Sequence, residues 1–418
     1  MPNCHAPVVK GWKRISLILW LLCSLATRGA SQEQLREKYW REDLEEVRQK
    51  LPKLHKDLFH KLPREKFQSE LSALEKAVPT LRDSEVIVAL MRLIASVGDP
   101  HTQVDPDTAG FHDYPLELLW FPDGLHVIAT LRTHREILGA KLVQIGDVPI
   151  GLAMQRVVPV FPRVNLPGVQ ADITDYLTTP EVLFAQKIVP SEHRARFIFE
   201  DPSGKKVAVQ LSALGAHERP AWISVPSKAL QHKHSDLYYW YEYLPDSKTL
   251  YFNYSRCREM KQQPFREFNQ KIFEFIDAHA VDRLVVDLRG NGGGDSEVIE
   301  PFVKEVVKRQ SINQDGHLFV LIGRSTYSSG VMAAYRFVTD TEALFIGGPT
   351  GGKPNFFGEV ETFKLPHSHL EIRYSTDFFR LVDYDEMPSL FPDINVTLSW
   401  ADFLAGRDPV LEAALQHK

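Results

Sequence analysis

The pattern of hydrophobic and polar positions divides the chain into three parts, of which the first is helical. Residues 32–97 are rich in Glu, Lys, Arg and Leu and repeat apolar side chains at helical spacing. We expect the last helix of this part to start near Asp83 and to end at Gly98, because a polar cap and a glycine are common at these two positions. Its predicted apolar face consists of Val86, Ile87, Leu90, Leu93 and Ile94.

The second part, residues 114–214, carries the signals of β-hairpins. Turn sequences at 121–124, 145–147 and 201–204 each stand between alternating or β-branched runs. Helical turns are expected between 171 and 188, with a break at Pro180. These patterns predict a β-rich domain.

The third part, from about residue 237 to the end, alternates strands with helices. A hairpin at 237–255 comes first. The strands expected after it are 283–288, 317–322 and 343–346, and the helices are 264–280, 298–307 and 330–337. Such alternation predicts an α/β layer with a largely parallel sheet.

Two neighbouring segments of this third part carry candidate chemistry. Residues 284–295 (LVVDLRGNGGGD) and 319–334 (FVLIGRSTYSSGVMAA) each read as a buried strand, a tight turn and a helix. Their turns are therefore expected at the same edge of the sheet. One turn offers glycine amides and the other a serine, which are the nucleophile and the oxyanion donors that acyl transfer needs.

Ser328 is the candidate nucleophile, because it precedes a predicted helix whose free amides and dipole favour negative charge. The amide of Ser329 is one candidate oxyanion donor, and that of Gly292 or Gly293 is the other. The alternative for either serine is a helix N-cap. The alternatives for the glycine run are a phosphate-binding loop and a purely structural turn. Spacing alone does not decide between these two and an oxyanion hole.

Composition and charge exclude one class of partner. The chain has 418 residues, with 49 basic and 54 acidic side chains and a net charge of −5, so it lacks the electrostatic footprint of a nucleic-acid-binding protein. Cys257 is the only cysteine outside the leader region described next, which predicts a mature chain without an internal disulfide.

The N-terminus has basic, apolar and small residues in the order that is typical of a signal peptide. Basic residues up to Arg14 precede an apolar run at 15–26, which is too short to span a bilayer, and small residues follow up to Ala30. We expect residues 1–30 to be a signal peptide, the protein to be exported (periplasmic or secreted), and no stable membrane insertion after the leader is removed. The alternative is an uncleaved anchor.

Several motifs, in order, resemble the tail-specific, or carboxyl-terminal processing, serine peptidases, with the tricorn core as a close relative. They are VGDPHT at 97–102, VVDLRGNGGG at 285–294, STYSSG at 325–330, GGPTGGKPNFFGE at 347–359, FPDI at 391–394 and GRDPVLEAAL at 406–415. The resemblance implies an α/β fold with a crotonase or caseinolytic-protease-like ββα core, an N-terminal helical domain and a PDZ-like β-rich insert. It also implies a peptide or protein substrate.

The expected domains are the signal peptide at 1–30, a helical domain at 31–110 that ends in the DPHT turn, a PDZ-like domain at 111–235, and a catalytic core at 236–418. The segment 138–150 resembles part of a peptide-binding PDZ module, but the insert lacks a clear carboxylate-binding loop.

Members of the family activate the nucleophilic serine with one of two general bases, and the sequence favours one of them. In the Ser-Lys version the base lies 25 residues after the serine, where this chain has Lys353, but the orienting glutamine four residues on is replaced by Phe357. In the tricorn-like version a histidine in the DPHT turn is the base, here His101, and a glutamate before the FPDI motif orients it, here Glu386. A histidine is the better-suited base near neutral pH. We therefore favour Ser328, His101 and Glu386, with Lys353 as the alternative base.

Some positions leave the assignment open. Asp383 or Asp385 could replace Glu386 in the same acidic loop, and Val331 stands where the family often has a glutamate. No cofactor and no metal are expected, because His232 and His234, like His367 and His369, form pairs without a matching cysteine or carboxylate cluster. The leading hypothesis is an exported serine endopeptidase that acts on peptides or unfolded protein tails. The alternatives are a non-catalytic binding protein on this scaffold and a crotonase-like acyl-CoA enzyme.

Overall fold

The computed structural model describes residues 12–215, 218, 220–384 and 387–417, with side chains from residue 32 onward. The predicted leader therefore lies partly outside the described residues. In the described part of the chain, no helix is both long enough and apolar enough to cross a membrane.

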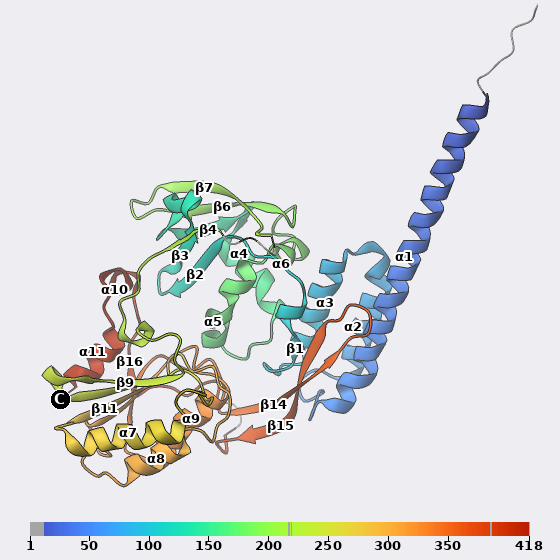
Figure 1. Cartoon of the computed structure of the whole chain (residues 1–418). Helices are drawn as coiled ribbons and strands as arrows, with labels where there is room; N and C mark the ends of the chain where they lie inside the picture. Colours follow the sequence, from blue (N-terminus) through green and yellow to red (C-terminus); the bar gives the residue numbers. More distant parts are fainter. Residues whose placement is uncertain (1–11, 216–217, 219, 385–386, 418) are drawn as a thin grey trace, which may run out of the picture.

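The N-terminal part is helical, as the apolar spacing predicts. The long helix α1 leads away from the body of the molecule toward the N-terminus, and two shorter helices pack beside its C-terminal half (Figure 1). The bounds are α1 Trp12–Leu54, α2 Arg64–Ala77 and α3 Asp83–Ala95, with the 3₁₀ turn η1 Val78–Thr80. All five predicted apolar positions of α3 are buried. Pro52 could be expected to break α1, but it lies in the last turn of this helix.

The β-rich part forms a sheet in the order β2-β3-β4-β6-β7, with β5 paired to β4 and β8 to β3. The three predicted hairpins are present, and the turns connect β2 to β3, β4 to β5 and β6 to β7. The strands are β2 Leu116–Phe121, β3 Gly124–Leu131, β4 Lys141–Ile145, β5 Val148–Pro149, β6 Arg194–Glu200, β7 Lys206–Ser212 and β8 Trp222–Ser224. The helices are α4 Ile150–Val157, α5 Leu166–Leu177 and α6 Pro180–Ala185, with 3₁₀ turns η3 Arg132–Ile137 and η4 Val158–Val160. Pro180 begins α6, where its fixed φ suits the first helical turn.

The C-terminal part is the predicted α/β layer. Its six-stranded sheet has the order β16-β13-β12-β11-β10-β9, parallel except for the antiparallel hairpin of β9 and β10. The strands are β9 Tyr239–Leu244, β10 Thr249–Tyr254, β11 Arg283–Asp287, β12 Leu318–Ile322, β13 Leu344–Gly347 and β16 Ile394–Asn395. The helices are α7 Phe265–Ala278, α8 Glu300–Val307, α9 Ser329–Asp340, α10 Trp400–Ala405 and α11 Pro409–Gln416, with 3₁₀ turns η5 Leu230–His232 and η6 Pro245–Ser247.

Helices cover both faces of this sheet. Apolar side chains of α7, α8 and α9 form one core with β10, β11 and β12, and those of α11 form a second core on the opposite face. The strands β10 and β12 are buried along their whole length, which explains why they read as continuous apolar runs rather than as alternating ones.

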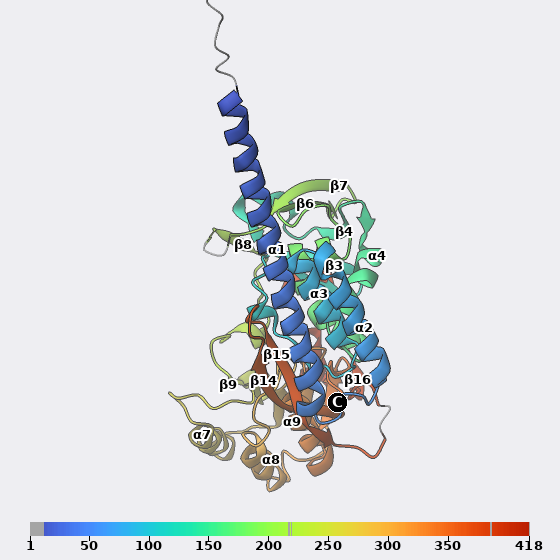
Figure 2. The same cartoon turned by 90° about the vertical axis from the view of Figure 1, so that its right-hand side faces the viewer.

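A long hairpin joins the C-terminal layer to the N-terminal helices. Strands β14 Asn355–Lys364 and β15 Glu371–Arg380 leave the six-stranded layer and reach α1, where β15 pairs with β1 Gln103–Val104 (Figures 1 and 2). The 3₁₀ turn η2 Pro106–Thr108 follows β1. This three-stranded sheet connects the segment that contains His101 to the C-terminal part of the chain, although more than 200 residues separate His101 from Ser328.

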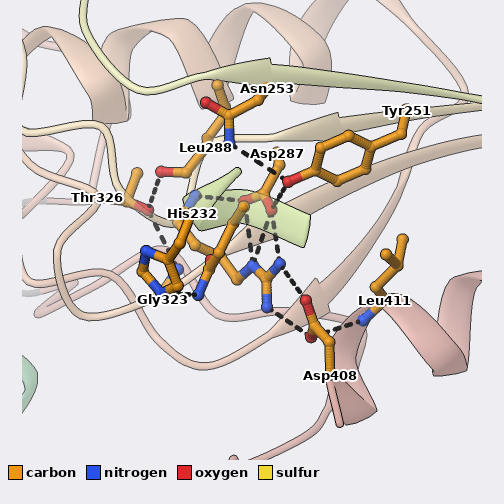
Figure 3. A network of polar contacts seen from close by, with 11 residues as sticks. His232, Tyr251, Asn253, Asp287, Leu288, Gly323, Thr326, Asp408 and Leu411 are labelled. Carbon is orange, nitrogen blue, oxygen red and sulfur yellow. Dashed lines mark hydrogen bonds and ion pairs between the residues drawn. The ribbon is translucent and has the colours of Figure 1, made fainter. Parts of the chain in front are cut away.

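A buried ionic network fixes the end of β11 to the C-terminal helix (Figure 3). Both Arg289 Nη atoms donate to Asp408 at 2.8 Å, and Arg289 also bonds Asp287, whose carboxylate accepts from Tyr251 Oη at 2.7 Å. Asp408 also accepts from the Leu411 amide and so caps α11. Burial alone would raise the pKa of Asp408, but the Arg289 charge and its hydrogen bonds hold that pKa below its usual value.

Substitution of Asp408 tests this network. Asp408→Asn keeps a capping oxygen but leaves the Arg289 charge partly uncompensated, so we expect the free energy of unfolding in urea to fall by about 3 kcal/mol. The matched control is Glu412→Gln, which breaks the exposed pair with Arg407 and should cost less than about 1 kcal/mol. Equal losses in the two variants would contradict a structural role for the network.

Candidate active site

The two turns singled out in the sequence lie against each other at the carboxyl ends of β11 and β12. The Tyr327 amide donates to Asn291 O at 2.9 Å, and Thr326 Oγ1 donates to Leu288 O at 2.8 Å. Asn291 is fully buried, and its side chain donates to Tyr254 O. Adjacent parallel strands thus deliver the glycine turn and the serine turn to one edge of the sheet, as their spacing predicts.

Two glycines allow the turns to approach closely. A Cβ on Gly330 would stand 2.3 Å from Asn291 O, so no larger residue fits there without a shift. A Cβ on Gly293 would stand 2.7 Å from Ser328 Cβ and 3.2 Å from Ser328 Oγ. The backbone of Gly293 therefore lies directly beside the candidate nucleophile.

Ser328 has the backbone of a strained turn. Its φ of 51° and ψ of −128° lie in a region that residues other than glycine rarely adopt. It occupies the N-cap position of α9, yet its side chain makes no capping hydrogen bond, and Oγ bonds none of the described residues. The N-cap reading therefore fails for Ser328. The Ser329 hydroxyl also does not cap the helix, since it donates to Gly294 O at 2.5 Å.

The candidate oxyanion donors differ in their present bonds. The Ser329 amide begins α9 and bonds no acceptor among the described residues. The Gly293 amide already donates to Asn291 Oδ1 at 3.0 Å, whereas Gly292 is exposed and its amide has no bond to a described residue. A helix N-terminus with free amides next to an unbonded hydroxyl is suited to stabilising a developing oxyanion.

His101 lies close to the serine turn but is not bonded to Ser328. Its ring stacks between Tyr327, at 4.9 Å between centroids, and Phe356, at 5.6 Å. Its Nδ1 stands 3.4 Å from Tyr327 Oη, and its buried Nε2 has no hydrogen-bond partner in the described part of the chain. Burial lowers the pKa of His101, and the charge of Arg163 lowers it further. The charge of Asp99 and a backbone contact of Phe357 raise the same pKa.

The turn that carries His101 is held by Asp99. The Asp99 carboxylate accepts from the His101 amide at 2.9 Å and lies 3.9 Å from His101 Nδ1. His55, Thr102 and Ser375 also donate to it. Sequence reasoning placed Asp99 in the turn but gave it no role, although its position two residues before His101 was a usable signal.

The two remaining candidates have different outcomes. Glu386 lies outside the described residues, so its role stays a prediction. Lys353 is half-buried and forms no hydrogen bond or ion pair with the residues that the structure describes. The preceding Gly352 lies near Ser328, since a Cβ on it would stand 3.3 Å from Ser328 N. Phe357, at the family's glutamine position, packs against His55, His60 and Phe378 instead.

A loop of the β-rich part also reaches the site, and no pattern in the sequence indicated this contact. The Arg163 guanidinium stands over the Tyr327 ring at 5.2 Å and pairs with Asp172. Two residues on, the Asn165 side chain donates to Thr350 O and Pro388 O. The loop before α5 thus contacts both the serine turn and the segment that leads to Lys353.

Residues 32–384 and 387–417, apart from the gaps near 216–219, contain no group of three or more side chains arranged to hold a metal ion.

Comparison with known proteins identifies the fold. No protein-family model and no curated protein sequence matches this chain. Among solved structures, mature CPAF complexed with lactacystin matches with a TM-score of 0.65 and 13% identity over 91% of this chain and 98% of that one. A second structure of mature CPAF matches with a TM-score of 0.61 and 12% identity, over 91% and 97% of the two chains. A photosystem II D1 C-terminal processing protease gives a TM-score of only 0.41 at 15% identity, over 90% and 98%.

At these identities the likeness establishes the fold. The α/β fold with an N-terminal helical region is confirmed, and it is the fold of mature CPAF. The PDZ-like character of the insert and the domain boundaries stay predictions.

The backbone of Ser328 allows a test that is independent of activity. Because glycine adopts this conformation without strain, we expect Ser328→Gly to be more stable than Ser328→Ala by about 1 kcal/mol in urea unfolding. Ser325 is an exposed control without a positive φ, and there the glycine variant should be no more stable than the alanine variant. The same order at both positions would show that the turn at Ser328 is not strained.

Proposed function

We propose that the protein is a serine-type peptidase that hydrolyses peptide bonds of peptides or unfolded protein tails through an acyl-enzyme on Ser328. The observation that carries the proposal is the unbonded Ser328 hydroxyl, held on a strained turn between Gly293 and the N-terminus of α9. Strained strand-to-helix turns of this kind expose a nucleophile and place backbone amides beside it. The resemblance of the motifs to tail-specific peptidases supports the same function.

The proposed reaction begins when Ser328 Oγ attacks the carbonyl carbon of the scissile bond. The hydroxyl proton passes to Nε2 of His101, and the Ser329 amide, with that of Gly292 or Gly293, stabilises the oxyanion. His101 then protonates the leaving amine as the C–N bond breaks. Water next gives a proton to His101 and attacks the acyl carbon, and the bond to Ser328 Oγ breaks as His101 returns the proton to that oxygen. Glu386 is proposed to orient the imidazole.

His101 must approach Ser328 for this reaction, because the described structure contains no hydrogen bond between them. Catalytic hydrogen bonds are often long before substrate binds. Nε2 is free to accept the proton, and burial keeps the imidazole neutral at pH 7 by lowering its pKa. Export through the leader is part of the proposal and rests on the sequence pattern of residues 1–30 alone.

Substitutions at the two candidate bases test the assignment. Hydrolysis of a fluorescently labelled unfolded protein should be abolished in Ser328→Ala. His101→Ala should lower kcat by about 10³ or more, because it removes the general base. Lys353→Ala should keep most of the activity. If His101→Ala stays active while Lys353→Ala is inactive, the base is Lys353.

The pH dependence provides a second test. A base acts in its neutral form, so activity should be full above the pKa of His101 and fall as the pH drops through it. Because burial lowers that pKa from its ordinary value of about 6.5, we expect the acidic limb of kcat/KM below about pH 6.5. A lysine base would instead place the limb on the alkaline side of neutrality, and this result would contradict the assignment.

A further inference from the structure

Asp99 is a fully buried carboxylate that joins three distant parts of the chain. Its Oδ2 accepts from Thr102 Oγ1 at 2.6 Å, Ser375 Oγ at 2.6 Å and His55 Nε2 at 3.0 Å. His55 directly follows α1, and Ser375 lies on β15. The side chain is 0% exposed. Burial alone would raise the pKa of Asp99, but the hydrogen bonds from His55, Ser375 and Thr102, with the charge of His101, hold it below its usual value.

The other oxygen of this carboxylate faces the candidate base. Oδ1 accepts from the His101 amide at 2.9 Å and lies 3.9 Å from His101 Nδ1. The opposite ring nitrogen, Nε2, is the one that has no partner among the described residues. An imidazole base needs this polarity, with negative charge near Nδ1 to stabilise the imidazolium and Nε2 free to take the proton.

We infer that Asp99 is a positioning residue for His101, whose buried negative charge stabilises the imidazolium that forms when Ser328 is deprotonated. This inference deepens the proposed function and rests on it. The distance of 3.9 Å is too long for a hydrogen bond but short enough for a strong charge interaction in a buried site. The proposed role of Asp99 is separate from that of Glu386, which stays the predicted orienting residue.

The other charged and titratable groups around His101 come from three further elements. Arg163 approaches from the loop before α5, and Tyr327 from the turn before α9. His55 lies on the far side of Asp99, in the segment after α1. Asp99 is the carboxylate among these groups, and its charge, together with a backbone contact of Phe357, opposes the effect of Arg163 on the pKa of the imidazole.

A purely structural role for Asp99, as the cap of the DPHT turn, predicts a different result. If the carboxylate only held the turn, its loss would loosen the turn and admit water to the buried imidazole. The pKa of His101 would then rise toward its ordinary value, because burial is what lowers it. If Asp99 acts through its charge, removing the charge without changing the shape must lower the pKa of His101 further. The sign of the change separates the two roles.

The experiment titrates the His101 ring by NMR in the full chain, with the resonance assigned by its absence in His101→Gln. We expect the pKa of His101 to be lower in Asp99→Asn than in the unsubstituted protein. The matched control is Ser375→Ala, which removes one hydrogen bond to Asp99 and keeps the charge, and should leave the His101 pKa nearly unchanged. An unchanged or raised pKa in Asp99→Asn overturns the inference.

Kinetics on the same proteins provide the second measurement. Asp99→Asn should lower kcat by about tenfold or more with little change in KM, and should move the acidic limb of kcat/KM to lower pH. Normal kcat in an Asp99→Asn protein whose hydrolysis still depends on Ser328 overturns the inference and leaves the proposed function intact. Absence of any Ser328-dependent hydrolysis in the unsubstituted protein instead overturns the proposed function, and the NMR titration still decides whether the Asp99 charge acts on His101.

Discussion

The geometry of the candidate site depends on the buried guanidinium of Arg289, which lies between Asp287 and Asp408. Arg289 lies two residues after the end of β11, at the start of the glycine turn, and Asp408 is the N-cap of the C-terminal helix α11. A buried charge without a partner is costly, so the three side chains keep these two segments together. The start of the glycine turn is therefore fixed in position. The serine turn is held against it, because Thr326 and Tyr327 of the serine turn donate hydrogen bonds to the backbone of the glycine turn.

The rest of the site comes from parts of the chain that are far apart. His101 belongs to the segment between the helical part and the β-rich part, and the hairpin of β14 and β15 carries Phe356 to one face of its ring and Ser375 to its supporting carboxylate. Arg163 approaches from the β-rich part. The β-rich part and the C-terminal part thus each contribute a side chain within contact distance of Tyr327 or His101. A change in the packing of any one part is expected to change the surroundings of the imidazole.

Local patterns predicted most of the secondary structure. The apolar face of α3, the hairpins of the β-rich part and the strands and helices of the parallel layer follow from periodicity and turn residues, and the structure has them within a few residues of the expected bounds. The meeting of the glycine and serine turns was predictable for the same reason, since adjacent parallel strands end at one edge. The strained backbone of Ser328 was not, because φ depends on how Gly330 and Gly293 let the two turns approach.

Interactions between distant segments could not be predicted in the same way. Nothing in the local sequence of residues 355–380 indicated that this hairpin would reach α1 and pair with β1, and nothing around Arg163 or Asn165 indicated contact with the serine turn. Asp287, Arg289 and Asp408 lie in the motifs at 285–294 and 406–415, but the motifs did not indicate that these side chains form an ionic network. The opposite charges next to apolar runs were the only sequence signal for it. The choice between His101 and Lys353 rested on the missing glutamine, on Glu386 before the FPDI motif and on the suitability of histidine as a base near neutral pH. The structure adds that Phe357, at the glutamine position, packs in an aromatic cluster.

Ser328 is proposed to be an activated nucleophile, and its reaction with a fluorophosphonate is the decisive measurement. Mass spectrometry of the intact protein and of its peptides at pH 7 to 8 should find one adduct, on Ser328, that is absent in Ser328→Ala and forms much more slowly in His101→Ala. A folded protein that forms no adduct at Ser328 would contradict the account and would favour a non-catalytic binding protein on the same fold.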